Sequence, residues 1–203
     1  MQKTLTVIDD FIRNPEQMIL ESKTLNYSLS KGGLANMISE KSKYTPGICR
    51  RLNTMYHCKT RWGPHSGTFR SITERQILKT KRKFYVHSDG VFDFTGLLYL
   101  NHTRECHGGT NFFRHKETGL DGTHDLEAIA KYLNKNHLTY QELLDIFFRD
   151  AQVPSKWALT DVVQMKFNRM IVFNGKNFHS PIYEFRKARP AKRLSYVCYG
   201  EII

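Results

Sequence analysis

The stretch Phe84-Tyr85-Val86-His87-Ser88-Asp89-Gly90 places an imidazole and a carboxylate two residues apart in a β-prone segment. In a β-strand successive side chains point to opposite faces, so we expect His87 and Asp89 to project to the same side. A second imidazole, His179, follows the apolar run Met170-Ile171-Val172-Phe173 and a turn signal. Two histidines and a carboxylate on one face form a set of metal ligands that leaves coordination positions open.

The chain of 203 residues is long enough for one domain with a substantial core. Its hydrophobic content of 40% and aromatic content of 12% are typical of a folded protein. Without an internal repeat, a low-complexity tract or a linker, we predict a single domain over residues 1–203. The net charge of +12 favours anionic partners, such as nucleic acid, anionic lipid or a small dianionic cosubstrate; a solvated basic surface is the alternative.

The four cysteines, Cys49, Cys58, Cys106 and Cys198, are far apart and form no C-x-x-C pair. This spacing argues against a zinc ribbon and against a thioredoxin-like site. The first residues carry no apolar signal-peptide core, and no apolar run approaches the roughly 18 residues of a membrane span. We therefore expect reduced thiols in a soluble, cytoplasmic protein with no membrane partner.

Strands are expected where β-prone residues cluster. The segments are 5–8, 68–86, 94–101, 108–113, 161–166, 169–174, 182–186 and 194–199. Leu97-Leu98-Tyr99-Leu100 is almost continuously apolar, as expected of a strand buried on both faces. Because only a short turn around residues 103–105 separates 94–101 from 108–113, we expect these two strands to form an antiparallel pair.

Helices and loops are indicated by capping and turn residues. Asn14 followed by Pro15 predicts the start of a helix. Residues 28–47 are rich in Ser, Gly and Lys and predict an extended loop, either a cover over a site or a disordered segment. A short helix is expected within 48–61, ended by Trp62-Gly63-Pro64.

Residues 123–150 break the β pattern with apolar residues spaced three and four apart. This spacing predicts two helices with a break near 134–136, the second capped by Thr139 with Glu142 completing a capping box. We interpret the segment as an insertion packed against the sheet or near the mouth of the site. Four histidines between 101 and 124 are irregularly spaced, and we interpret them as loop residues rather than as a second metal site.

Arg193-Leu194-Ser195 lies on a late strand whose alternation puts Arg193, Ser195 and Val197 on one face. A guanidinium beside a hydroxyl is well suited to binding a carboxylate through paired charge-assisted hydrogen bonds. Tyr99 follows the metal motif by one strand, and its phenol either contacts the same carboxylate or packs in the core.

In this order the motifs resemble the 2-oxoglutarate/Fe(II)-dependent dioxygenases, in the prolyl-hydroxylase-like branch. The matching pieces are Val7-Ile8-Asp9-Asp10-Phe11, His87-Ser88-Asp89, Tyr99-Leu100-Asn101, Gly108-Gly109-Thr110, Val172-Phe173, His179 and Arg193-Leu194-Ser195. The resemblance implies a mainly β fold with flanking helices around a double-stranded β-helix core, a jelly roll of the cupin type.

The resemblance also implies that His87, Asp89 and His179 form the catalytic metal site and hold Fe(II). With 2-oxoglutarate as cosubstrate and O2 as oxidant, the implied reaction is hydroxylation with release of succinate and CO2. Asp89 favours hydroxylation over halogenation, because the halogenases of this superfamily have a small residue there that leaves room for chloride. The implied substrate is a small molecule, a protein side chain or a nucleobase.

The far carboxylate of 2-oxoglutarate would, by the same resemblance, be bound by Arg193, Ser195 and Tyr99. Arg193 lies farther beyond the third metal ligand than this branch leads us to expect, so Arg186 and Arg189 are rival anchors. The alternative function is a non-enzymatic nucleic-acid-binding protein on the same fold, which the basic charge favours.

Overall fold

The computed structural model describes residues 5–30, 36–57, 59–63, 65–80, 84–90, 92–184 and 192–203. The strands are β1 (Thr6–Ile8), β2 (Tyr27–Leu29), β3 (Met37–Lys41), β4 (Thr60–Trp62), β5 (Thr68–Thr73), β6 (Phe94–Tyr99), β7 (Gly108–His115), β8 (Trp157–Gln164), β9 (Met170–Phe173), β10 (His179–Tyr183) and β11 (Lys192–Ile202). The helices are α1 (Pro15–Ser22), α2 (Thr45–Met55), α3 (Glu74–Lys79), α4 (Leu126–Asn136) and α5 (Tyr140–Asp150), with short 3-10 turns at Thr103–Glu105 and Pro154–Lys156.

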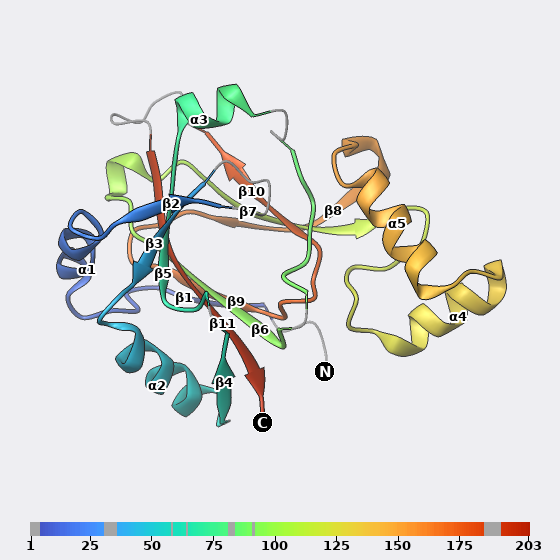
Figure 1. Ribbon diagram of the computed structural model, residues 1–203, viewed down its shortest axis with the longest axis horizontal. Helices are drawn as coiled ribbons and strands as arrows, with labels where there is room; N and C mark the ends of the chain where they lie inside the picture. Colours follow the sequence, from blue (N-terminus) through green and yellow to red (C-terminus); the bar gives the residue numbers. More distant parts are fainter. Residues whose placement is uncertain are drawn as a thin grey trace.

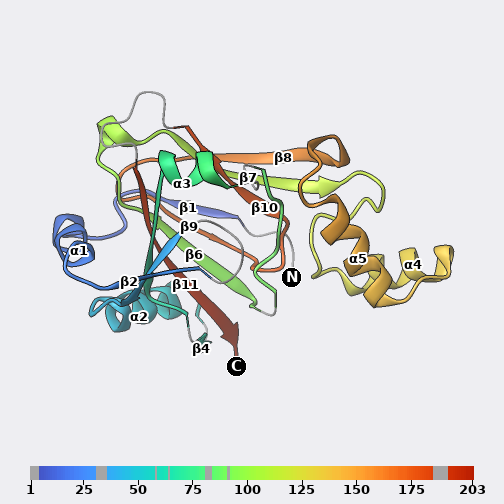
Figure 2. The same cartoon turned by 45° about the horizontal axis from the view of Figure 1, so that its top comes forward.

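Two antiparallel sheets make up the centre of the molecule (Figure 1). The larger sheet has the order β1-β9-β6-β11-β5-β3-β2, with β4 paired to β11, and the smaller has the order β10-β7-β8. The chain crosses between the sheets repeatedly, since β6 leads to β7, β8 leads to β9, and β10 leads to β11 (Figure 2). Facing antiparallel sheets with such crossings form a jelly roll, which confirms the predicted fold class.

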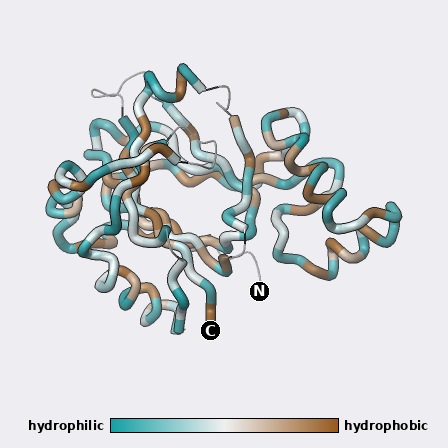
Figure 3. The backbone as a smooth tube through the Cα atoms, in the orientation of Figure 1, coloured by the Kyte–Doolittle hydropathy of each residue, from teal (hydrophilic) through white to brown (hydrophobic). Residues whose placement is uncertain are grey.

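Strand β11 shows how alternating side chains build the layers. The even-numbered residues from Leu194 to Cys198 pack into an apolar cluster with residues of α1 and α2, which cover the outer face of the larger sheet. The odd-numbered residues from Arg193 to Tyr199 line a cavity between the sheets. Hydrophobic residues accordingly follow the central strands (Figure 3). The period of two in the sequence thus separates a core face from a site face.

Helices α4 and α5 lie to one side of the sheets as a hairpin inserted between β7 and β8 (Figure 1). Thr139 and Glu142 form the predicted capping box at the start of α5. The apolar face of α5 buries Leu143 and Phe147 in a cluster that also contains Trp157 and Phe178. The insertion is therefore packed on the end of the smaller sheet, beside the residue that precedes His179.

A buried hydrogen bond between an imidazole and a carboxylate ties this hairpin to the sheet. His115 on β7 is 0% exposed, and its Nε2 lies 3.1 Å from Oδ2 of Asp150, the last residue of α5. Arg149 Nε donates to the same carboxylate at 2.9 Å, and the indole of Trp157 donates to the Asp150 carbonyl at 2.8 Å. His115 lies in a strand, so the interpretation of this histidine as a loop residue is wrong.

The structure corrects two predictions about strands, one about which strands pair and one about where a strand lies. Strands β6 and β7 do not pair with each other: β6 pairs with β9 and β11, and β7 pairs with β8 and β10. Both edges of β6 are already hydrogen-bonded, one to β9 and the other to β11, so no edge is left for β7. Helix α3, with its own capping box at Thr73 and Gln76, interrupts the predicted strand-rich stretch.

The predicted loop at 28–47 is also wrong in part. Its described residues contribute β2 and β3, which form an antiparallel hairpin that extends the larger sheet beyond β5. Helix α2 confirms the short helix predicted after this loop, but Trp62 belongs to β4 instead of a terminating turn. The basic run Lys81-Arg82-Lys83 lies outside the described residues.

Three cysteines, Cys49, Cys106 and Cys198, are free thiols, as predicted, and Cys58 lies outside the described residues. Burial raises the pKa of the Cys49 and Cys106 thiols to about 11, so both stay protonated at neutral pH. Within the part of the chain that the structure describes, no helix has the length and apolar character needed to cross a membrane.

We expect Asp150→Asn to lower the free energy of unfolding by about 3 kcal/mol at neutral pH, because it removes the charged carboxylate that accepts hydrogen bonds from His115 and Arg149. Hydrogen bonds from Arg149 lower the pKa of Asp150 to about 2, from an ordinary value of 3.8. A lowered pKa means that this stabilisation is present above about pH 4 and is lost as the pH falls toward 2. Urea unfolding of both proteins at several pH values measures the difference.

Asp145→Asn, on the exposed face of α5, is the matched control and should change stability by less than about 0.5 kcal/mol. Equal stability of the wild type and Asp150→Asn at pH 7 would contradict the role given to the Asp150 carboxylate.

Candidate metal centre

The backbone brings the two predicted histidine ligands together. The His87 N–H donates to the His179 carbonyl at 3.0 Å, and the His179 N–H donates to the His87 carbonyl at 2.9 Å. Two residues paired in this way in an antiparallel bridge project to the same face, and the ring centroids lie 4.4 Å apart. Residues 84–90 form this isolated bridge and not the regular strand that the sequence predicts.

Asp89 completes the group. Its N–H donates to the Gly175 carbonyl at 2.7 Å, which holds the segment against the turn between β9 and β10. The predicted turn is present, closed by the bond from the Asn177 N–H to the Asn174 carbonyl at 2.9 Å. Together these bonds place the Asp89 carboxylate beside both imidazoles.

The donor atoms of His87, Asp89 and His179 all lie within 4.8 Å of one another. Asp89 Oδ1 is 4.0 Å from His87 Nε2, and Oδ2 is 3.6 Å from His179 Nε2. Neighbouring ligands of an octahedral ion with bonds near 2.1 Å are about 3 Å apart, so small side-chain rotations bring the three atoms to ligand distances. The residue types and their separations therefore fit a divalent transition metal.

Each imidazole is oriented by a contact between its Nδ1 atom and the backbone carbonyl two residues earlier in the chain. His179 Nδ1 lies 2.9 Å from the Asn177 carbonyl, and His87 Nδ1 lies 3.4 Å from the Tyr85 carbonyl. A carbonyl accepts only from a protonated nitrogen, so each contact selects the tautomer whose Nε2 carries a free lone pair. Each histidine thus presents a ligand atom to the carboxylate.

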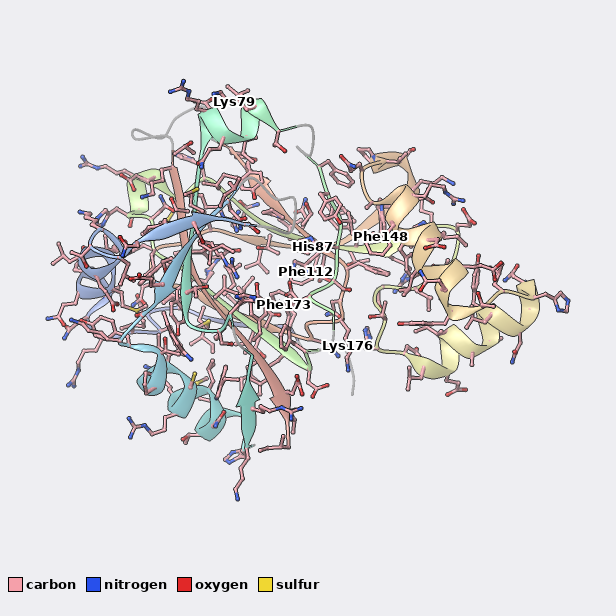
Figure 4. All side chains as sticks on the ribbon, viewed as in Figure 1. Lys79, His87, Phe112, Phe148, Phe173 and Lys176 are labelled. Carbon is pink, nitrogen blue, oxygen red and sulfur yellow. The ribbon has the colours of Figure 1, made fainter. Side chains whose placement is uncertain are left out.

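Burial and the neighbouring His179 lower the pKa of His87 to about 4. The neutral imidazole, which is the form that binds metal, therefore predominates at neutral pH. Phe173 and Phe112 surround the His179 ring, with centroids at 4.8 and 6.2 Å (Figure 4). These apolar walls shield one side of the ligand set.

Thr95 is a part of the site that the sequence did not reveal. Its hydroxyl donates to Asp89 Oδ2 at 2.6 Å, which holds the carboxylate in place between the imidazoles. Thr95 lies on β6, opposite Tyr199 of β11. Only the pairing of strands brings this hydroxyl to the carboxylate, so no spacing in the sequence predicts it.

The three ligands border a cavity of about 400 Å³ between the sheets. Arg193 and Ser195 both line it, on the shared face that the alternation of β11 predicts. Arg193 is 6% exposed, and its Nη1 donates to the carbonyls of Gly109 at 2.6 Å and Ile182 at 3.1 Å. The guanidinium is therefore held rigidly in the cavity wall.

Tyr99 lies beside Arg193, with the guanidinium carbon 5.3 Å from the ring centroid. Its hydroxyl bonds to Thr110 at 2.8 Å, and burial raises the pKa of the phenol. Among the described residues, Thr110 lines the cavity and Tyr99 does not, so direct contact of Tyr99 with a ligand stays a prediction. The rival anchors Arg186 and Arg189 lie outside the described residues.

A second arginine, Arg70 of β5, also lines the cavity and was missed from the sequence. It lies directly opposite Ser195 in the pairing of β5 with β11. The signal was a charged residue inside the β-prone stretch Phe69-Arg70-Ser71-Ile72. The face of the sheet on which Arg70 lies can be assigned only when the strand that pairs with β5 is known.

The fold and the site define a jelly-roll protein with a candidate metal centre of two histidines and an aspartate. Residues 70–192 match the model of a family of unknown function, DUF6445, and the chain belongs to this family. No curated protein matches the chain significantly.

Two solved structures resemble this one over most of their length. One is the non-heme alpha ketoglutarate dependent epimerase SnoN from nogalamycin biosynthesis, with 11% identity, a TM-score of 0.53, and coverage of 98% of this chain and 79% of that chain. The other is HygX from Streptomyces hygroscopicus with nickel and 2-oxoglutarate bound, with 10% identity, a TM-score of 0.54, and coverage of 98% and 82%. At these identities the likeness shows the fold.

We expect His179→Ala to weaken Co(II) binding by more than the about 10–100-fold that loss of an outer partner costs, because a direct ligand is removed. Calorimetry and the visible absorption of bound Co(II) measure the change. His65→Ala, an exposed histidine outside the cavity, should bind Co(II) as the wild type does. Unchanged binding by His179→Ala would exclude this metal centre.

Thr95→Val removes the hydroxyl that holds Asp89 while keeping the size of the side chain. We expect Co(II) affinity to fall about 10–100-fold, as for other partners that orient a metal ligand. Thr24→Val, which removes an exposed hydroxyl, is the control and should leave the affinity unchanged. Equal affinities of wild type and Thr95→Val would show that the carboxylate needs no such support.

Proposed function

We propose that this protein is an Fe(II)- and 2-oxoglutarate-dependent dioxygenase that hydroxylates a small-molecule substrate or a protein side chain. The observation that supports the proposal most strongly is that the His87, Asp89 and His179 group borders a cavity whose wall carries Arg193. The fold likeness adds support, since SnoN is described as alpha ketoglutarate dependent and HygX holds 2-oxoglutarate. Placement in the prolyl-hydroxylase-like branch rests on the order of the motifs.

The two Nε2 atoms and one carboxylate oxygen would hold the iron, and three protein donors leave positions for other ligands. When bound together, Fe(II) and 2-oxoglutarate supply the oxidation that converts a substrate C–H bond, 2-oxoglutarate and O2 into C–OH, succinate and CO2. Asp89 occupies the ligand position that halogenases leave small, which favours hydroxylation over halogenation.

Arg193 is the anchor that we propose for the far carboxylate of 2-oxoglutarate. A guanidinium has five N–H donors; the two carbonyl bonds of Arg193 use only Nη1, and the Tyr99 phenol lies close to the guanidinium as well, so some donors remain for a ligand. The Tyr183 ring, 5.7 Å from the guanidinium carbon, flanks it on the cavity side, and Ser195 adds a hydroxyl. Such a pairing is charge-assisted and bidentate.

Apolar side chains keep water away from the reacting atoms. Leu144 and Phe147 of α5 and Phe178 beside the third ligand line the cavity. A low-dielectric wall strengthens the charge pairing at Arg193 and limits side reactions with water. The nucleic-acid-binding alternative, based on the net charge of +12, stays a prediction.

We expect the wild type to form succinate slowly from 2-oxoglutarate with Fe(II) and O2, even without a substrate. Asp89→Ala should reduce this rate to background. Arg193→Gln should raise the KM for 2-oxoglutarate about 100-fold or more, because it loses charge-assisted bonds worth about 1.5–3 kcal/mol each. Succinate is quantified by mass spectrometry.

Co(II) binding by Arg193→Gln shows that its metal site remains folded. Arg104→Gln, an exposed arginine away from the cavity, is the control and should keep the wild-type KM. A folded, metal-loaded wild type that forms no succinate would overturn the proposed function.

A further inference from the structure

Arg70 is a second cationic group in the cavity wall, separate from the anchor proposed at Arg193. Its neighbour across the sheet is Ser195, and its guanidinium lies close to the phenol of Tyr199, farther along β11. Tyr199 in turn pairs with Thr95, whose hydroxyl holds Asp89. Arg70 therefore faces the part of the cavity next to the metal ligands, whereas Arg193 lies toward the other end of β11.

The charges that line the cavity leave Arg70 without a counter-charge. Asp89 is the only carboxylate among the described lining residues, and it is a metal ligand. Under the proposed function, Fe(II) and Arg193 together balance the charges of Asp89 and the 2-oxoglutarate dianion. One positive charge remains, that of Arg70. A partly enclosed cation without a counter-ion favours an anionic ligand.

A second observation on the same wall points to a polar ligand. Asn36 also lines the cavity, next to the start of β3, the strand that pairs with β5. Its Oδ1 is buried and has no hydrogen-bond partner within the described part of the chain. Buried amide oxygens normally accept a hydrogen bond, so this oxygen marks a position for a donor that the described part of the chain does not supply.

The opposite wall of the cavity is apolar. Leu144, Phe147 and Phe148 of α5 line it, and Phe148 is 68% exposed although it is a large aromatic residue. Figure 4 places Phe148 on the α5 side of His87. An exposed aromatic side chain at the edge of a polar site is typical of a surface that a ligand covers.

We propose that the substrate is a small carboxylic acid with an apolar body, its carboxylate bound by Arg70 and its apolar part packed on α5. This inference rests on the proposed function. A cavity of about 400 Å³, shared with 2-oxoglutarate, is near the lower end of ligand pockets, about 300–1,000 Å³, and so suits a small molecule. Between the two walls, the carbon to be oxidised would lie beside His87 and Asp89.

The test compares 3-phenylpropionate with its neutral amide, 3-phenylpropanamide, on protein loaded with Ni(II) and 2-oxoglutarate, which does not turn over. Ligand-observed NMR gives both dissociation constants. We expect the acid to bind the wild type at least about tenfold more tightly than the amide, with a preference that falls as salt increases. Arg70→Gln should abolish the preference, and Arg70→Lys should retain part of it.

Two control variants distinguish the contribution of the Arg70 charge from that of apolar contact. Arg75→Gln removes an exposed arginine outside the cavity and should keep the preference for the acid. Phe148→Ala should weaken both probes by a similar factor, because it removes only apolar contact. Equal binding of acid and amide by the wild type, no binding of the acid, or an unchanged preference in Arg70→Gln would overturn the proposal.

Succinate formation by the wild type with Fe(II) is measured in parallel. Succinate without a preference for the acid would remove the Arg70 site and leave the proposed function. A preference for the acid without succinate would support the Arg70 site and remove the proposed function.

Discussion

The candidate site depends on one backbone interaction, the antiparallel bridge between His87 and His179. Two N–H to carbonyl bonds join a short segment before β6 to the start of β10. Because paired residues in such a bridge share a face, the two imidazoles are forced together. The bond from the Asp89 N–H to Gly175 extends the same attachment by two residues and brings in the carboxylate. A shift of this bridge by one residue would turn the histidines to opposite faces and abolish the site.

The sequence predicted what short-range periodicity determines. The two-residue spacing of Arg193 and Ser195 places both on one face of β11, as alternation requires, and His87 and Asp89 also lie together although residues 84–90 form only an isolated bridge. The capping box of Thr139 and Glu142 was predicted for the same reason, since it joins residues three apart. In each case the residues that interact are near neighbours in the chain. For such near neighbours, backbone geometry restricts the possible relative positions of the two side chains.

The errors concern partners that are distant in the sequence. Strand β6 was expected to pair with β7 because the two are adjacent in the chain, but its two edges pair with β9 and β11, which are far away in the sequence. Thr95, although only six residues from Asp89, and Arg70 were missed because the faces on which they lie depend on strand pairing. Their side chains reach the cavity only because β6 and β5 flank β11 in the sheet. The direction in which a strand residue points is uninformative until its partner strand is known.

One apolar cluster connects the helical insertion to the candidate metal ligands, because it contains Leu143 and Phe147 of α5 and also Val86 and Phe178, the residues that precede His87 and His179. Phe178 lies immediately before His179 and stacks edge-on against both Phe147 of α5 and Trp157 of β8. The buried pair of His115 and Asp150 holds the end of α5 against the same strands. The helix that forms the apolar wall is thus positioned by the packing that also positions the third ligand. Phe147 belongs both to this cluster and to the cavity wall, whereas Phe148 lines the cavity without being part of the cluster, so a change at Phe148 alters the apolar wall and leaves the packing beside His179 intact. Substitution of Phe148 would therefore change which substrates the cavity accepts and would keep the candidate metal centre.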